Sequence, residues 1–165
     1  MKVVPIKVSL SSSSVSNAIE ELEDYQNSFE EKRRRLCQRL AEMGAVNVSL
    51  GFARSIYTGD NDFTVSVEPY DTGYRILASG TTVLFVEFGA GVTYGYGHPL
   101  DGELGMGPGT YPLGKGNWDN PKGWTLPKSK GGQHTYGNPP NMPMYNTAQD
   151  LKREIERVAT EVFGE

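Results

Sequence analysis

The chain has a single cysteine, Cys37, among its 165 residues. No internal disulfide can form, and a fold without disulfides is compatible with a reducing cytoplasm. Long apolar runs are also missing: no stretch approaches the roughly 20 residues of a membrane-spanning helix, and the first residues lack the apolar core of a secretory signal. The formal net charge is −4, whereas proteins that bind duplex nucleic acid are usually basic. These absences favour a soluble protein that is made in a cytoplasm and contacts no membrane.

The length suits one domain with a hydrophobic core, so we expect a single domain over residues 1–165. An alternation of apolar residues opens the chain and predicts a strand: Val4, Ile6, Val8 and Leu10. Pro5 removes one backbone donor, which favours a place at the edge of a sheet. Four serines follow at residues 11–14 and supply N-caps for a helix.

A long helix is predicted over residues 15–43. Apolar residues recur there at alternating spacings of three and four: Val15, Ile19, Leu22, Phe29, Leu36, Leu40 and Met43. Acidic residues come early and basic residues late, as the helix dipole prefers, and Gly44 marks the expected C-terminal end. At about 1.5 Å per residue the helix exceeds about 40 Å. One end should therefore project or pack against a neighbouring subunit.

Three antiparallel strands are predicted after the helix, over residues 46–52, 63–67 and 74–78, because apolar and polar residues alternate in each. The helix would cover their apolar face. The apolar run 83–88 fits a buried strand and a short helix equally well. A closing helix is predicted over residues 146–163, with an apolar stripe of Leu151, Ile155, Val158 and Val162. The expected fold class is therefore α+β.

A long loop insertion is predicted over residues 89–143, which hold 14 of the 20 glycines, 8 of the 10 prolines and both tryptophans. Long loops within compact domains are usually functional or disordered, and large aromatic rings are typical of surfaces that partners bury. We expect the insertion to order partly or wholly on assembly. The residues predicted to contact partners are Tyr94, Tyr96, Trp118 and Trp124.

Candidate catalytic groups are few. His98 and His134 are the only histidines; they are far apart in the sequence, and zinc sites need three or four ligands at tight local spacing. Solvated loop histidines are the favoured interpretation, and a metal-dependent or cell-wall-active hydrolase using them is an alternative function. Cys37 lies beside the apolar stripe in mid-helix, where a half-buried, inert thiol is favoured over a nucleophile. We therefore expect no enzyme, cofactor or metal.

Two further patterns are weak signals of ligand binding. The glycine clusters at 95–97 and 105–109 lack the lysine of a phosphate-binding loop. The basic run at 32–35 would spread around a helix instead of forming one patch. A solvated helix end, with pairs such as Glu31 with Arg35, is favoured there. A nucleic-acid-binding module remains the second alternative function.

Glu87 is a lone carboxylate in an apolar run. Burying it unpaired would cost several kcal/mol. We therefore expect it to face solvent, to accept hydrogen bonds from amides of the glycine turn that follows, or to pair across an interface.

The run Glu87-Phe88-Gly89-Ala90-Gly91 resembles the Glu-Phe-Gly-(Thr or Ala)-Gly signature of small tail-component proteins of long-tailed phages and prophages. The order of parts is also similar over nearly the whole chain: an N-terminal helix, a β-meander, the signature, a variable Gly/Pro/aromatic stretch, and a proline-led closing helix. The insertion is longer and richer in Trp and Tyr than this family's pattern.

The resemblance implies a helix on a small antiparallel sheet and a role in tail completion, at the head–tail joint or neck, as a non-enzymatic virion protein. Copies would form a ring and contact head-connector and tail-tube or terminator proteins, near DNA in the lumen but without specific binding. Glu87, Phe88, Gly89 and Gly91 transfer as a structural turn near an inter-subunit contact. The expected location is the virion, after assembly in the host cytoplasm.

Overall fold

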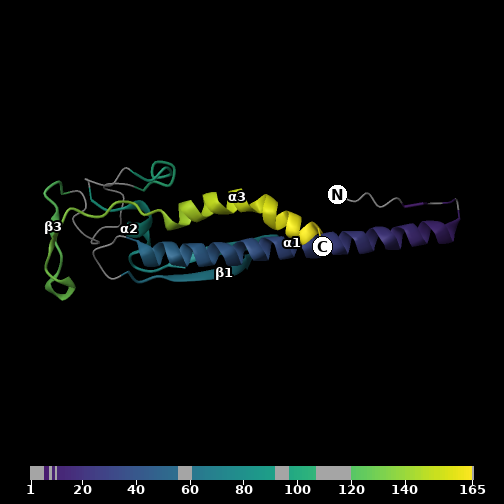
Figure 1. Cartoon of the computed structure of the whole chain (residues 1–165), viewed down its shortest axis with the longest axis horizontal. Coiled ribbons are helices and arrows are strands. Elements are labelled where there is room, and N and C mark those ends of the chain that lie inside the picture. Colours follow the sequence, from purple (N-terminus) through teal and green to yellow (C-terminus); the bar gives the residue numbers. More distant parts are fainter. Residues whose placement is uncertain are drawn as a thin grey trace.

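Two helices and a β-hairpin make up the body of the protein (Figure 1). The computed structural model describes residues 6–7, 9, 11–55, 61–91, 97–106 and 120–164. In chain order the elements are α1 (Ser12–Arg54), β1 (Thr64–Tyr70), β2 (Gly73–Ser79), α2 (Val83–Phe88), β3 (Trp124–Thr125), η1 (Lys128–Lys130), β4 (His134–Thr135) and α3 (Pro143–Gly164). The predicted α+β class is confirmed.

Helix α1 is longer than the sequence pattern predicts. It begins after Ser11, whose side chain accepts a hydrogen bond from the Ser14 backbone nitrogen at 3.3 Å, as an N-cap does. It continues to Arg54, so the strand predicted over residues 46–52 is wrong. Gly44 does not end the helix. It is buried, and a Cβ there would lie 2.4 Å from Ile76 Cδ1, so this glycine permits close packing of β2 against the helix.

Strands β1 and β2 form an antiparallel hairpin that runs from Thr64 opposite Ser79 to Tyr70 opposite Gly73. A two-residue turn closes it, with Asp71 in the left-handed region at φ 48°. The second and third predicted strands are therefore confirmed, and the sheet they form has two strands within the described residues. The strand predicted from Val4 to Leu10 lies largely outside those residues.

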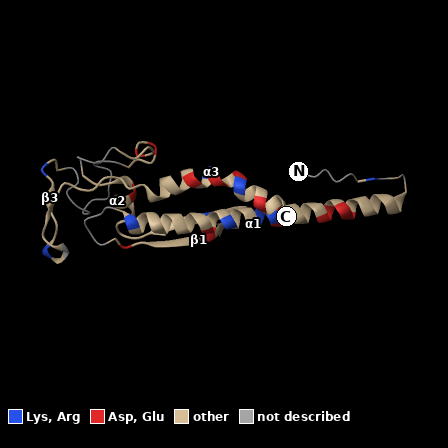
Figure 2. Cartoon of the chain, viewed as in Figure 1, with Lys and Arg blue, Asp and Glu red and all other residues tan. Residues whose placement is uncertain are grey.

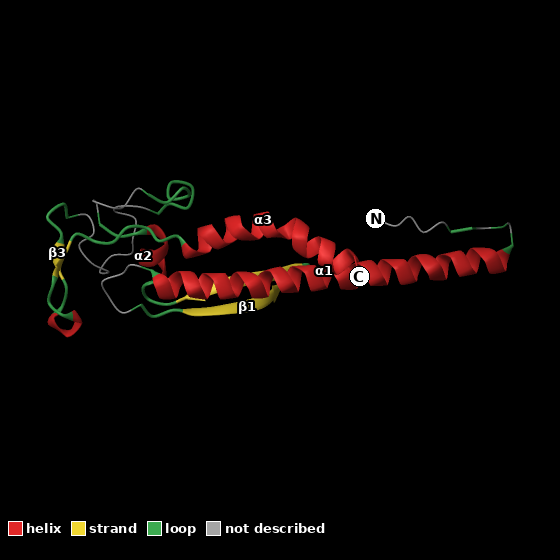
Figure 3. Ribbon diagram, viewed as in Figure 1, coloured by secondary structure: helices red, strands yellow, loops and turns green. Residues whose placement is uncertain are grey.

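The core joins the C-terminal part of α1 to α2, with the hairpin and the start of α3 packed against it (Figure 3). Its buried members are Val48, Phe52, Val83 and Val86, with half-buried side chains of the hairpin packed against them. Helix α3 begins at Pro143, three residues before the predicted start. Its Val158 and Val162 are fully buried as predicted, whereas Ile155 is 49% exposed and does not belong to the buried stripe.

Helix α1 extends well beyond the end of α3 (Figure 1). The last contact between the two helices' aromatic rings joins Phe29 and Phe163, with centroids 5.6 Å apart. N-terminal to that contact, α1 carries large apolar side chains that are roughly half exposed: Val15, Ile19, Leu22 and Tyr25. The expectation that one end of the long helix projects is confirmed. None of the described helices is long and apolar enough to cross a membrane.

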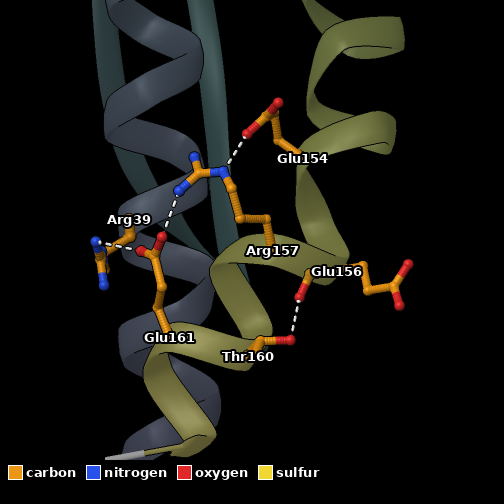
Figure 4. Close-up of polar contacts among 6 residues, drawn as sticks. All are labelled: Arg39, Glu154, Glu156, Arg157, Thr160 and Glu161. Carbon is orange, nitrogen blue, oxygen red and sulfur yellow. Dashed lines mark hydrogen bonds and ion pairs between the residues drawn. The ribbon is translucent and has the colours of Figure 1, made fainter.

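An ion-pair network joins the surfaces of α1 and α3 (Figure 4). Arg157 binds Glu154 at 2.6 Å and also pairs with Glu161, and Glu161 accepts a hydrogen bond from Arg39 of α1 at 3.0 Å. The hydrogen bond that Arg157 donates to Glu154, followed by the charges of Glu154 and Glu161, raises the pKa of Arg157 above its ordinary value. Because all members are exposed, the network adds little stability.

Candidate functional site

The signature residues 87–91 lie at the junction of α2 and the start of α3. The run 83–88, for which strand and helix were both open, is helical, and it ends at Gly89 with φ 78°. Thr82 precedes it without a side-chain capping bond to the helix. Its hydroxyl instead donates to Asp62 Oδ1 at 3.1 Å, which ties the start of α2 to a residue two positions before the hairpin.

Glu87 caps α3. The residue is 5% exposed, and its two side-chain oxygens accept hydrogen bonds from the backbone nitrogens of Met144 at 2.8 Å and Tyr145 at 2.9 Å. The first amides of a helix have no partner within the helix, and the positive end of the helix dipole favours a carboxylate. We expected bonds to backbone amides, and they exist. They come from α3, however, and not from the glycine turn, and Glu87 does not face solvent.

His98 is the third partner of this carboxylate. Its Nε2 lies 3.2 Å from Glu87 Oε1, and its ring packs on Phe88 with centroids 4.3 Å apart. The prediction of a solvated loop histidine is wrong, since His98 is 4% exposed. The Leu100 backbone nitrogen donates to His98 Nδ1 at 3.0 Å. That bond requires Nδ1 to be unprotonated, so the proton of the neutral ring is on Nε2, from which it is donated to Glu87.

His134 lies in a different setting. It is exposed, its Nε2 lies 2.9 Å from the Lys122 carbonyl oxygen, and its ring meets Tyr136 edge-on. The predicted exposure is confirmed for this histidine, although it lies on β4 and not in a loop. Within the described residues, no group of three or more His, Cys, Asp and Glu side chains is placed to hold a metal ion.

The glycines of the signature permit close contact between the turn and the chain that precedes α3. Ala90 and Asn138 form a β-bridge, with nitrogen-to-oxygen distances of 2.9 and 3.0 Å. A Cβ on Gly91, whose φ is 87°, would lie 2.2 Å from the Tyr136 carbonyl oxygen, and a Cβ on Gly89 would lie 2.8 Å from Pro140 N. Both positions therefore need glycine for conformation and for space.

Asn138 completes the joint. It is 5% exposed, and its side-chain nitrogen donates to the Phe85 carbonyl oxygen at 2.8 Å. Farther along, the Asn141 backbone nitrogen donates to the Val86 carbonyl oxygen at 2.9 Å. Sequence reasoning missed both asparagines. The dipeptide Asn138-Pro139 was a usable signal, because Asn before Pro is typical of turns with local side-chain bonding.

Phe88 forms a second apolar cluster with half-buried neighbours: Phe85, Met106 and Trp124. Of the aromatic residues predicted to contact partners, Trp124 thus packs within its own chain, on β3, which pairs with β4. Tyr94, Tyr96 and Trp118 lie outside the described residues. The described parts of the 89–143 insertion contain short elements, β3, η1 and β4, held by their own hydrogen bonds.

The remaining candidates, Cys37 and the basic run at 32–35, lie on α1. Cys37 is half-buried, as predicted. In the basic run, Arg33 pairs with Glu30 at 2.8 Å and also donates to the Thr72 carbonyl oxygen at the hairpin turn. The basic run is therefore a helix surface with local partners. The ion pair of Arg33 has i,i+3 spacing, and the pairing of Glu31 with Arg35 stays a prediction.

Comparison of the chain with models of protein families, with curated proteins and with solved structures found no match.

Proposed function

We propose that this protein is a structural subunit of a tailed-phage virion, a tail-completion or head–tail connector component that assembles as a ring. The observation that carries the proposal is the role of the Glu-Phe-Gly-Ala-Gly signature. Glu87 is hydrogen-bonded to the first turn of α3, and the glycines permit contacts that a side chain would block. A signature used as a joint between elements suits an assembly protein, whose parts must hold a fixed geometry.

The projecting part of α1 supports a subunit role independently of the resemblance. Side chains such as Ile19 and Leu22, 51% and 54% exposed, extend along a helix that leaves the body of the molecule. Contiguous exposed apolar surface of this kind marks protein contacts. The partners we propose are copies of the same chain, head-connector proteins, and tail-tube or terminator proteins. The site of action would be the neck of the virion, after assembly in the host cytoplasm.

The hydrolase alternative has less support. Glu87 and His98 are a buried acid–base pair, with side-chain exposures of 7% and 2%. A general base needs access to the proton it removes. Here the carboxylate accepts hydrogen bonds from two backbone amides, and both ring nitrogens of His98 already take part in hydrogen bonds within the chain. The nucleic-acid alternative also has less support, because Arg33 in the basic run is bonded to Glu30 and Thr72.

Deletion of the gene from the phage or prophage that encodes it tests the proposal. Electron microscopy of the lysate should show filled heads and separate tails, and the wild-type gene supplied in trans should restore joined particles. A gene carrying both His98→Gln and His134→Ala separates this role from a hydrolase. If folded protein is made, joining should persist. Normal joined particles from the deletion strain would refute the proposal.

A further inference from the structure

The N-terminal part of α1 continues an apolar seam beyond the point where α3 stops covering it. Inside the body, the seam passes along half-buried residues of α1, and Phe29 meets Phe163 at the end of α3. N-terminal to that contact, no described helix or strand covers α1 (Figure 1), and the segment before the helix is tied to its first turn by a hydrogen bond from the Ser9 backbone nitrogen to Ser14 Oγ at 2.9 Å. The exposed fractions there are 45% for Val15, 51% for Ile19 and 54% for Leu22, and Phe29, beside Phe163, is 44% exposed.

The spacing of this seam specifies a helix as its occupant. Val15, Ile19, Leu22, Gln26 and Phe29 follow one another at four, three, four and three residues. This is the heptad pattern of a coiled coil, with Val15, Leu22 and Phe29 at d and Ile19 and Gln26 at a. An extended strand or a globular surface has no such period. The uncovered length is about two heptads, which suits a weak pair that forms at high protein concentration.

Charge placement identifies which helix fits. Residues 12–29 carry four acidic side chains and no basic one, visible as the red bands on the projecting helix in Figure 2. Of the four, Glu20, Glu21 and Asp24 fall at positions b, c and f, which point away from the seam. Only Glu23 falls at a flanking position. In a parallel pair that position faces Ala18 of the other helix, so no acid is placed opposite an acid.

Gln26 favours the same arrangement. A polar residue at an a position costs stability against an apolar partner, but pairs with its own copy in a parallel, in-register coiled coil and so sets the register. Gln26 is exposed on α1. Toward the body the next a position is Arg33, which is already bonded to Glu30. The seam available to a second helix therefore ends where the chain's own contacts begin.

We propose that the N-terminal part of α1, residues 15–29, pairs in parallel and in register with the same part of a second copy. The inference goes beyond the proposed function: a parallel, in-register pair is a two-fold contact between identical surfaces, whereas neighbours around a ring meet through two different surfaces. Its test uses the purified full chain and no virion, so either proposal can fail while the other stands.

Disulfide trapping tests the register. With Cys37→Ser as background, Val15→Cys should form disulfide-linked dimers on mild oxidation at high protein concentration, because facing seam residues come within disulfide reach. Asn17→Cys is the matched control: it is exposed in the same turn but lies at position f, and it should remain monomeric. Linkage of Val15→Cys to Phe29→Cys in a mixture, with none between Val15→Cys chains, would indicate an antiparallel pair and overturn the proposal.

Sedimentation of the full chain provides a second measurement. Ile19→Gln with Leu22→Gln should weaken self-association by at least about ten-fold, which corresponds to about 1.4 kcal/mol. Glu20→Gln with Asp24→Gln is the control on the outer face and should weaken it by less than about two-fold. Thermal unfolding of the body should change little with either pair of substitutions. A chain that stays monomeric at the highest soluble concentration, or an equal effect of both pairs, overturns the proposal.

Discussion

The carboxylate of Glu87 accepts a hydrogen bond from the backbone nitrogen of Met144 at 2.8 Å, although the residues are 57 positions apart. One side chain thus fixes the end of α2 to the start of α3 across the whole insertion. Glu87→Gln should lower the free energy of unfolding by about 2 kcal/mol, because one oxygen and the charge that favour two helix amides are lost. Glu87→Ala should lower it by about 3 kcal/mol, since it also leaves the amides and His98 unpaired.

Urea unfolding followed by circular dichroism would measure these changes. Glu103→Gln is the matched control: it removes the same charge from an exposed residue, and the free energy of unfolding should stay within about 0.5 kcal/mol of wild type. Equal effects of Glu87→Gln and Glu103→Gln would contradict the cap.

The tautomer of His98 follows from its two hydrogen bonds. Because the Leu100 amide donates to Nδ1 and Nε2 faces Glu87, the neutral ring should carry its proton on Nε2. Long-range proton–nitrogen NMR spectra of the folded chain at neutral pH distinguish the two ring nitrogens. His134→Gln leaves one histidine and makes the assignment unambiguous. A proton found on Nδ1 would be incompatible with the bond from Leu100.

The signature glycines should tolerate no side chain. Gly91→Ala should lower the free energy of unfolding by about 2–4 kcal/mol, because a Cβ would meet the Tyr136 carbonyl oxygen at a positive φ. Gly102→Ala is the control, since a Cβ there would meet nothing within 4 Å, and it should be neutral within about 0.5 kcal/mol. Chemical denaturation of both variants checks the difference, and a neutral Gly91→Ala would show that the turn adapts.

Asp62 should titrate below the ordinary range of an aspartate. The hydroxyl and backbone nitrogen of Thr81 donate to its carboxylate, with a smaller contribution from Thr82, and they lower its pKa. The associated stability is present above the usual pKa of about 3.9 and is lost as pH falls through the lower folded value. An NMR titration should show the pKa rising in Thr81→Ala and remaining low in Thr81→Ser, which keeps the hydroxyl. Equal values in Thr81→Ala and wild type would contradict this origin.

The fold was predictable from sequence where one pattern dominates. The apolar residues from Val15 to Met43 follow a helical period, and no strand-like alternation overlaps it. In the strands around Val65 and Ile76, apolar and polar residues alternate regularly. The prediction failed at residues 46–52. Alternating apolar residues there also place Val48 and Phe52 at helical i,i+4 spacing, and both side chains are fully buried on α1. The sequence predicts a C-terminal helix end at Gly44, but glycine is needed there because Ile76 packs closely against it. That contact is tertiary and leaves no mark in the local sequence.

The candidate site was only partly predictable, for a related reason. Sequence shows that Glu87 needs partners, because a buried carboxylate alone is too costly. It cannot show that the amides belong to Met144 and Tyr145, or that His98 turns inward to the same oxygens. Those contacts join residues that are far apart in the sequence, and the local alternation of apolar and polar residues does not predict them.

The bridge between Ala90 and Asn138 means that the insertion leaves and re-enters the body at one point. The geometry at this joint therefore does not depend on the number of residues between Ala90 and Asn138. Lengthening the chain between Met106 and Trp124, which both pack against Phe88, changes mainly its loop-closure entropy, which grows slowly with length, while α2, α3 and the cap keep their places. The joint at Glu87 therefore lets that stretch of the insertion change in length and sequence without refolding the rest of the protein.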